Sequence, residues 1–484
     1  MAEEKKHQLG IQVDKDEDIQ KWYTDIIGKT NLIEYTDVSG CYILKPKAQF
    51  MWDTIHTAMD VLLAKRGVKN ASFPLLIPES LLLKEKEHVE GFAPEVAWVT
   101  EGGSTKLSER LAIRPTSETI MYPAYAKWIR SHKDLPLKIN QWCSVVRWEF
   151  KNPVPFLRSR EFHWQEGHTV FATKAEADKE TKDILVNVYK RIYEKLLAIP
   201  CMVGRKSTKE KFAGADYTNS CEIFLPIGKA IQGCTTHCLG QNFAKAFNIT
   251  FMDKDQQQKH AWQNSWGFST RSLGIVIMMH SDSKGLVIPP RIAEHKIIVI
   301  PILSKEDNAP VLAYAKEVMK ALRTFSPLLD ERIDYSVGYK FNDAELNGYP
   351  IRIELGKKEC AERSLTVIRR DTLEKQQISF VGAKKTIARL LDDIHDAMFT
   401  KAKAFLEGSI VEEYQDAEKI ALLVKDKKIV KTYFSDSPET DELIKEKTGA
   451  KTLNIPFNEK IPAGATCPFS GKPATNIVFV AKSL

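Results

Sequence analysis

The sequence predicts an α/β protein made of several domains, and three observations lead to this prediction. The chain has 484 residues, of which 43% are hydrophobic, and this is enough to bury several cores. Segments with apolar residues at helical spacing alternate with short apolar runs typical of strands. The segment 281–290 contains Gly285 and the pair Pro289-Pro290, which indicates a break between two units.

The first unit is expected from Ile19 to about Lys284. Its clearest helical pattern is in 53–64, where Ile55, Met59 and Leu62 are spaced to lie on one face. Two other segments, 117–129 and 183–199, have similar patterns, and the second is strongly amphipathic. Strands are predicted over 142–150 and 167–172, and a short apolar run bounded by prolines covers 73–77. The residues before this unit are polar, and we expect 1–20 to be a flexible segment.

The second unit begins with a run rich in β-branched residues, 296–303, which fits a buried parallel strand. The alternation that follows predicts a compact, mostly parallel α/β domain, with helices over 310–326 and 384–407 and strands over 332–336, 351–355 and 364–369. From about Gly408 the chain is expected to form a smaller mixed unit that ends in a strand over 476–481.

Composition restricts the function classes. The net charge of +7 permits a polyanionic partner without requiring one. The eight cysteines are scattered, so a disulfide framework is not expected. The N-terminal residues lack the apolar stretch of a secretory signal, and the apolar runs are too short to cross a bilayer. These features predict a cytoplasmic protein with no membrane role.

Four clusters of residues are candidates for chemistry. The first is Arg114-Pro115-Thr116-Ser117-Glu118, where proline pre-sets a turn into a helix. Thr116 and Glu118 then project from the start of this helix; the alternative is a simple helix cap.

In the second cluster, Arg147 and Glu149 are expected on one face of a strand. An arginine-rich loop carries Arg158 and Ser159 to a second strand with Phe162 and Trp164. Such a hairpin could clamp phosphates, whereas the alternative is a surface hairpin with cross-strand ion pairs.

The third cluster, Asn264 to Arg271, contains small residues and places an arginine at a helix start, against the helix dipole. Such a local conflict is more common at functional sites, although an ordinary surface arginine is the alternative.

The fourth cluster contains Gln232, Cys234, Thr235, His237 and Cys238. Zinc binding by three ligands this close together is a poor fit, and polar residues lining a small-molecule pocket are favoured.

Together the clusters resemble the signature motifs of class II aminoacyl-tRNA synthetases, in their expected order. The stretch from Trp22 to Lys69 resembles motif 1, the hairpin resembles motif 2, and WGFSTRSLG resembles motif 3. The combination of RPTSE, VRWEF, LRSREFHWQEGH and QGCTTHCLGQNF closely resembles prolyl-tRNA synthetases of the eukaryotic and archaeal type. The resemblance covers nearly the whole chain from Trp22 onward.

The resemblance implies a fold and a reaction. The catalytic domain, 21–288, would be an antiparallel sheet of six or seven strands flanked by helices. It would be followed by an α/β anticodon-binding domain, 289–400, and a C-terminal domain, 401–484. The enzyme would use ATP with Mg²⁺ to activate L-proline as prolyl-adenylate and then transfer proline to tRNA(Pro). It would act as a homodimer through motif 1.

The resemblance also implies roles for individual residues. Arg147 would hold the α-phosphate and the proline carboxylate, and Arg271 would cover the nucleotide, so both would be catalytic. ATP would further contact Glu149, Arg158, Ser159, Phe162, Gln232 and Thr235. Proline would lie among Thr116, Glu118, Arg147, Trp164, His237, Ser265 and Gly267.

Two departures from the wider family have consequences. The C-terminal domain of the family often holds zinc through four cysteines, but only Cys467 follows Cys360 here, so no structural zinc is expected. About 100 residues separate Glu166 from Ser265, too few for the bacterial-type editing insertion. A proline pocket rejects the smaller alanine only weakly, so mischarged tRNA would need correction by another protein.

Two alternative functions remain. A threonyl, glycyl, seryl or histidyl enzyme would share the class, but a threonyl pocket would need zinc ligands. A catalytically silent paralogue that binds tRNA should have lost Arg147, Glu118 or Arg271, and all three are present.

Overall fold

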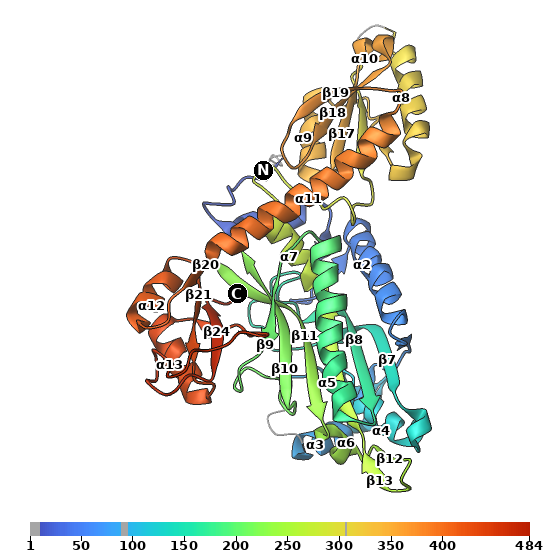
Figure 1. Ribbon diagram of the computed structural model, residues 1–484. Coiled ribbons are helices and arrows are strands. Elements are labelled where there is room, and N and C mark those ends of the chain that lie inside the picture. The colour runs from blue at the N-terminus through green and yellow to red at the C-terminus, as the bar shows by residue number, and fades with distance from the viewer. Residues whose placement is uncertain (1–9, 89–94, 305–306) are drawn as a thin grey trace, which may run out of the picture.

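The computed structural model describes residues 10–88, 95–304 and 307–484. Figure 1 shows a large lower body built around a long sheet, an upper body joined to it, and a third body at the side of the sheet. The long helix α11 (Ala383–Ser409) runs from the upper body to the third. None of the helices in the described ranges has the length and apolar composition needed to cross a membrane.

The lower body is organised by an eight-stranded sheet with the order β23-β9-β10-β11-β14-β8-β7-β3. All its pairings are antiparallel except that of β3 with β7. The antiparallel pairing agrees with the expected class II sheet, but the sheet has eight strands where six or seven were expected, because the two-residue strands β3 and β23 extend its edges. The strands are β3 (Lys69–Asn70), β7 (Leu137–Val146), β8 (Glu161–Phe171), β9 (Met202–Arg205), β10 (Tyr217–Leu225), β11 (Lys229–Gly240), β14 (Trp262–Ser269) and β23 (Ile455–Pro456).

Helices bury their apolar faces on this sheet. One core joins three of these helices to strand β14. It contains Trp22 of α1, Ile55 and Met59 of α2, Leu273 of α7 and Trp266 of β14, all fully or almost fully buried. Helix α7 is buried over most of its length, as its continuous apolar sequence predicts. The helices are α1 (Ile19–Lys29), α2 (Pro46–Ala64), α3 (Glu79–His88), α4 (Glu118–Trp128), α5 (Lys174–Asp183), α6 (Asn242–Phe247) and α7 (Arg271–His280).

The smaller sheets of this body pair β1 (Ile33–Tyr35) with β2 (Tyr42–Leu44), β12 (Thr250–Met252) with β13 (Gln258–His260), and β6 with β4 and β5. The last three are β4 (Leu76–Pro78), β5 (Trp98–Gly102) and β6 (Thr105–Ile113). The predicted helix over 183–199 is part of a longer one. It begins at Lys174 behind a Thr173–Glu176 capping box and continues through two π-helical segments, Ile184–Tyr189 and Ile192–Leu196.

The upper body contains the sheet β16-β15-β17-β18-β19. Parallel pairing of β15 with β16 and β17 confirms the buried parallel strand predicted at its start. The predicted strand over 332–336 is wrong: these residues form bends and the cap of α9, because Ser336 accepts from the Tyr339 amide. The elements are β15 (Ile297–Pro301), α8 (Ala309–Ala321), β16 (Leu328–Leu329), α9 (Val337–Asn347), β17 (Ile351–Leu355), α10 (Lys357–Glu362), β18 (Ser364–Arg369) and β19 (Lys375–Ser379).

The third body, which we call the C-terminal unit, follows α11 and has the sheet order β20-β21-β24-β22. Its β24 coincides with the predicted strand over 476–481. The expected boundary at residue 400 falls inside the continuous helix α11. The elements are β20 (Ile410–Glu412), α12 (Ala417–Lys425), β21 (Ile429–Phe434), α13 (Pro438–Thr448), β22 (Lys451–Thr452) and β24 (Asn476–Ala481).

The described part of the N-terminal segment, residues 10–20, contacts the end of α7. The ammonium of Lys15 donates to the Met278 and Ser281 carbonyls at 2.8 and 2.7 Å and lies over the Trp22 ring. Burial lowers the pKa of Lys15 to about 8. Residues 10–20 are therefore attached to the end of α7, and the rest of the expected segment, 1–9, lies outside the described residues.

Candidate active site

A cavity of about 310 Å³ opens on the face of β8, β11 and β14, beside the start of α4. On β8, alternation of side chains brings Trp164, Glu166 and His168 to the same face. The lining of the cavity contains most of the residues that the sequence analysis proposed for the site: Thr116, Glu118, Arg147, Phe162, Trp164, Gln232, Thr235, His237, Ser265, Gly267 and Arg271.

The pairing of β8 with β14 depends on a glycine. A Cβ atom on Gly167 would lie 2.2 Å from the Trp266 ring, so only glycine lets this ring pack against β8. Trp266 in turn supports the strand that carries Ser265 and Gly267 to the cavity.

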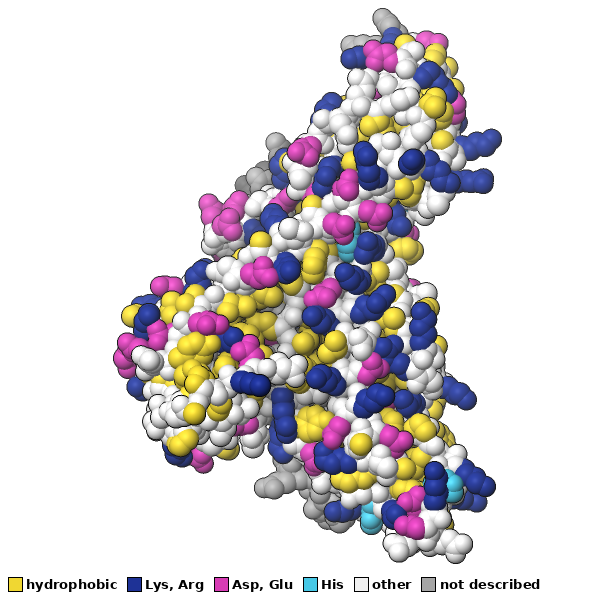
Figure 2. Space-filling model, in the orientation of Figure 1, with side chains coloured by type: hydrophobic (Ala, Val, Ile, Leu, Met, Phe, Trp, Pro, Cys, Tyr) yellow, Lys and Arg dark blue, Asp and Glu magenta, His cyan; other side chains and the backbone are white. Residues whose placement is uncertain are grey.

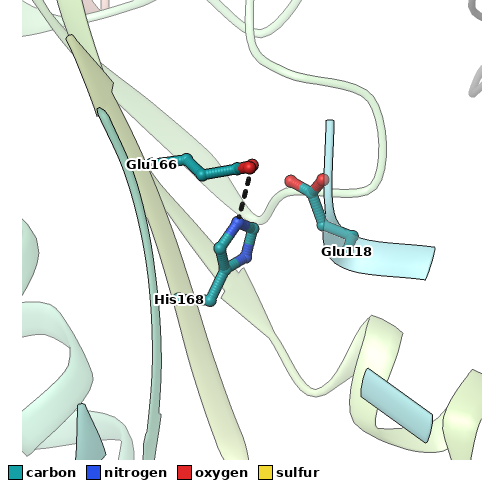
Figure 3. A group of neighbouring side chains, drawn as sticks. All are labelled: Glu118, Glu166 and His168. Carbon is teal, nitrogen blue, oxygen red and sulfur yellow. Dashed lines mark hydrogen bonds and ion pairs between the residues drawn. The ribbon is translucent and has the colours of Figure 1, made fainter. Parts of the chain in front are cut away.

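One end of the cavity is anionic and buried. Glu118 is the first residue of α4, and its carboxylate points toward that of Glu166 (Figure 3). The Thr116 hydroxyl donates to Glu118 and lies 3.3 Å from Glu166. Ser117, which precedes α4, makes no side-chain cap; instead its amide and hydroxyl both donate to Glu166. The capping part of the alternative is therefore wrong, although Glu118 does lie in the first turn of α4; Thr116 and Glu118 line the cavity.

An imidazole balances one of the two carboxylates. Nε2 of His168 lies 3.2 Å from Glu166, and Nδ1 lies 3.1 Å from the Tyr122 hydroxyl. Burial alone would lower the pKa of His168, but the charges of Glu118 and Glu166 raise it above its usual value. Burial alone would raise the pKa of Glu166, but the contacts with His168, together with Ser117 and Gln141, lower it to about 2. With His168 protonated, the group of three keeps one net negative charge and can attract a cation.

This group is also the one set of side chains, within the described ranges, that could meet around a metal ion. Both oxygens of Glu166 already accept hydrogen bonds from Ser117, Gln141 and His168. An imidazole is also a poor ligand for Mg²⁺, which prefers oxygen ligands and retains water. The group fits an ammonium better than it fits magnesium.

Aromatic rings form the wall next to the anionic end. Trp164 donates to Cys143 Sγ at 3.3 Å and meets Phe162 edge-on, with ring centroids 6.0 Å apart. Across the cavity, His237 lies between the hydroxyls of Thr218 and Thr235, at 2.9 and 3.0 Å. Burial lowers the pKa of His237 to about 3, so this ring is a neutral wall. These two hydroxyls hold the His237 ring in place.

Two arginines make part of the cavity lining cationic. Arg147 donates from Nε to the Pro115 carbonyl at 3.0 Å, and its guanidinium lies 5.1 Å from the Trp164 ring. Arg271, the first residue of α7, donates to the carbonyls of Leu157 and Gln232, both at 3.2 Å. Burial lowers the pKa of Arg271. Neither arginine forms an ion pair with a carboxylate among the described residues, so an anion in the cavity would find both available.

Three of the predicted ATP contacts lie outside the cavity lining. Strand β7 ends at Val146, so the expected placement of Arg147 and Glu149 on one strand face is wrong; Glu149 occupies an exposed turn. Arg158 donates to the backbone carbonyl of Leu484. Ser159 is buried. The prolines and arginines of the 147–160 loop carry the chain away from a regular hairpin.

The cavity also contains residues that the sequence reasoning missed. Glu166 and His168 follow Trp164 at the two-residue spacing of a strand, a signal that was available in the sequence. Glu210 and Phe212 come from the loop between β9 and β10, where no pattern points to the cavity.

Comparison with known proteins agrees with this geometry. Family models match residues 98–280 (tRNA synthetase class II core domain (G, H, P, S and T)), 296–390 (anticodon binding domain) and 417–484 (prolyl-tRNA synthetase, C-terminal). A cytoplasmic proline--tRNA ligase of Arabidopsis thaliana is 45% identical, over 98% of this chain and 91% of the relative. Proline--tRNA ligase 2 of Clostridioides difficile is 45% identical over 97% of both chains.

A solved structure is equally similar. The prolyl-tRNA synthetase of Cryptosporidium parvum, complexed with halofuginone and AMPPNP, superposes with a TM-score of 0.94. The two chains are 42% identical, and the superposition covers 100% of this chain and 99% of the other. The chain therefore belongs to the prolyl-tRNA synthetases, a family of class II aminoacyl-tRNA synthetases.

Proposed function

We propose that the cavity activates L-proline with ATP, giving prolyl-adenylate and pyrophosphate, and then transfers proline to the 3′ end of tRNA(Pro), releasing AMP. The observation that carries the proposal is the polarity of the cavity: a buried anionic group at Glu118 and Glu166, an aromatic wall, and two arginines, Arg147 and Arg271, that donate to backbone carbonyls. Free proline has the same polarity, with a secondary ammonium on an apolar ring and a carboxylate.

The secondary ammonium of proline would donate to Glu118, with Thr116 beside it, and the ring would lie between Trp164 and His237. Ser265 and Gly267 would form the floor of this subsite. The proline carboxylate would then face Arg147, where it can attack the α-phosphorus in line as pyrophosphate leaves. Arg147 would stabilise the charge that develops on the phosphoryl oxygens.

Arg271, Gln232 and Thr235 would hold the nucleotide, and Phe162 would stack on adenine. Glu149, Arg158 and Ser159 would reach ATP only if the 147–160 loop moves toward the cavity. Mg²⁺ would enter with the phosphates of ATP as part of the substrate, since Mg²⁺ commonly keeps its waters and substrate oxygens. No protein-bonded intermediate is needed, so positioning and electrostatics would supply the catalysis.

The other parts of the chain would serve the tRNA. We propose a catalytic domain over 21–288, an anticodon-binding domain over 289–400 and a C-terminal domain over 401–484 that needs no zinc. The protein would be a cytoplasmic homodimer joined through the segment from Trp22 to Lys69. Figure 2 shows Lys and Arg side chains together with acidic ones on this face of the molecule.

The test is amino-acid-dependent exchange of pyrophosphate into ATP, measured with each of the twenty amino acids. The proposal expects the highest kcat/KM with proline and weak exchange with alanine. Strong exchange with another amino acid would keep the class and refute the pocket assignment. No exchange with any amino acid from folded protein would favour a silent tRNA-binding paralogue.

A further inference from the structure

The loop between β9 and β10, residues 206–216, lies between the cavity and the C-terminal unit, and we call it the pocket loop. On its inner side, Glu210 and Phe212 line the cavity. The Phe212 ring packs on His237 with centroids 4.6 Å apart, and the Phe212 amide donates to Thr218, which also contacts His237. The position of this loop therefore determines one wall of the amino-acid subsite.

On its outer side, consecutive residues of the pocket loop are each contacted by the C-terminal unit. The Thr208 amide donates to Asp436 at 2.8 Å. Lys209 forms an ion pair with Glu442. Glu210 pairs with Lys451 at 3.3 Å.

A buried contact joins the two parts at the base of the loop. The Thr452 hydroxyl donates to Asp441 and lies 3.4 Å from the Ser207 hydroxyl, and all three residues are buried. Beside it, β23 pairs with β9, so the C-terminal unit adds an edge strand to the catalytic sheet where the loop begins. The fully buried Asn454 donates to the Met202 carbonyl of β9 at 3.0 Å.

The loop is also anchored inside the catalytic sheet. Lys206 and Glu222, both buried, form an ion pair of 2.8 Å. The segment from Thr208 to Glu210, by contrast, is held by residues of the C-terminal unit, namely Asp436, Glu442 and Lys451. A loop of this kind loses conformational entropy when a ligand orders it, so contacts that order it beforehand increase affinity.

We propose that the C-terminal unit is a positioning element for the amino-acid subsite: Asp436, Glu442 and Lys451 hold the pocket loop so that Phe212 and Glu210 close the wall beside His237. The C-terminal unit thus sets the affinity for the amino acid without touching it. The inference rests on the proposed assignment of the cavity to proline.

The experiment compares two triple variants of the full-length chain. The loop-contact variant is Asp436→Ala, Glu442→Ala, Lys451→Ala, and none of these residues lines the cavity. The matched control is Glu413→Ala, Glu418→Ala, Lys447→Ala, which removes the same charges. Glu413 pairs with Lys419 and Glu418 pairs with Lys447, so these ion pairs join residues of the C-terminal unit to one another.

Pyrophosphate exchange then gives KM for proline, KM for ATP and kcat separately. The proposal expects the loop-contact variant to raise KM for proline by about threefold or more, because several exposed contacts are lost together. KM for ATP, kcat and the control variant should stay near wild type. Lys451→Arg alone, which preserves the pair with Glu210, should also keep the wild-type KM for proline.

An unchanged KM for proline in the loop-contact variant would overturn the inference. Equal changes in KM for ATP and kcat, or the same change in the control, would also overturn it, since they indicate a general structural effect. If wild type itself activates a different amino acid, the pocket assignment fails, and the same comparison made with that amino acid still tests the role of the loop.

Discussion

Replacing Gly267 with alanine would add one methyl group to the wall of the amino-acid subsite and narrow it. A Cβ atom built on this residue would lie 3.5 Å from the Gln165 carbonyl oxygen and 3.7 Å from the Trp164 ring, both ordinary contacts. Gly267→Ala should therefore fold with a thermal midpoint close to that of wild type. The new methyl group would occupy cavity space beside Trp164, where the proline ring is proposed to lie.

The size of the effect follows from the cost of overpacking. Forcing a methyl group into a filled site costs about 1–3 kcal/mol. If proline fills the subsite, kcat/KM for proline should fall by roughly fivefold to 150-fold. Alanine lacks the ring and should lose much less, so the ratio of proline to alanine activation should fall in parallel.

The assay is pyrophosphate exchange with proline and with alanine at saturating ATP, together with a thermal unfolding curve. Gly167→Ala is the matched comparison, because its methyl group would overlap the Trp266 ring and should lower the thermal midpoint. Unchanged proline activation by Gly267→Ala, or equal losses for proline and alanine, would refute the placement of the ring.

Three other predictions concern charge and metal. Arg147→Ala should reduce adenylate formation by about 100-fold or more while tRNA binding, measured by filter retention, stays near wild type; a parallel loss of both would contradict its role at the phosphate. Because the pKa of His168 is raised, its cationic form is complete below the usual histidine value and is lost as pH rises through the raised one. Loss of this proton leaves the group of Glu118, Glu166 and His168 with a second net negative charge, which attracts the proline ammonium more strongly. KM for proline should therefore fall on the alkaline side, and His168→Gln should remove this limb of the pH profile; a variant that keeps it would point to another group. Dialysis against a zinc chelator should leave the thermal midpoint unchanged, since Cys467 is the one cysteine of 401–484; a large drop would reveal a zinc site.

The sequence was sufficient for the elements with strong periodicity. The apolar spacing in 53–64 belongs to α2, and the β-branched run at 296–303 belongs to β15, because burial on one or both faces leaves a readable pattern. The segment 332–336 failed because its alternating residues serve a turn and a helix cap, where local hydrogen bonds override strand propensity.

The site was predictable where motif residues lie on regular elements. Thr116, Trp164 and Arg271 line the cavity, each at a helix start or on a strand. Arg158 was assigned to ATP by the resemblance of its segment to motif 2, and its present partner is the Leu484 carbonyl, 326 residues further along the chain. Glu210 and Phe212 reach the cavity because a loop packs between two units, and long-range packing of this kind leaves no local pattern in the sequence.

The central claim is that the anionic group at Glu118 and Glu166 holds the ammonium of proline while Arg147 faces its carboxylate. A crystal structure with L-proline and a non-hydrolysable ATP analogue tests it most directly. The account predicts the proline nitrogen within hydrogen-bond distance of Glu118, the ring between Trp164 and His237, and the carboxylate beside Arg147. Proline bound in the reverse orientation, or bound outside this cavity, would contradict it.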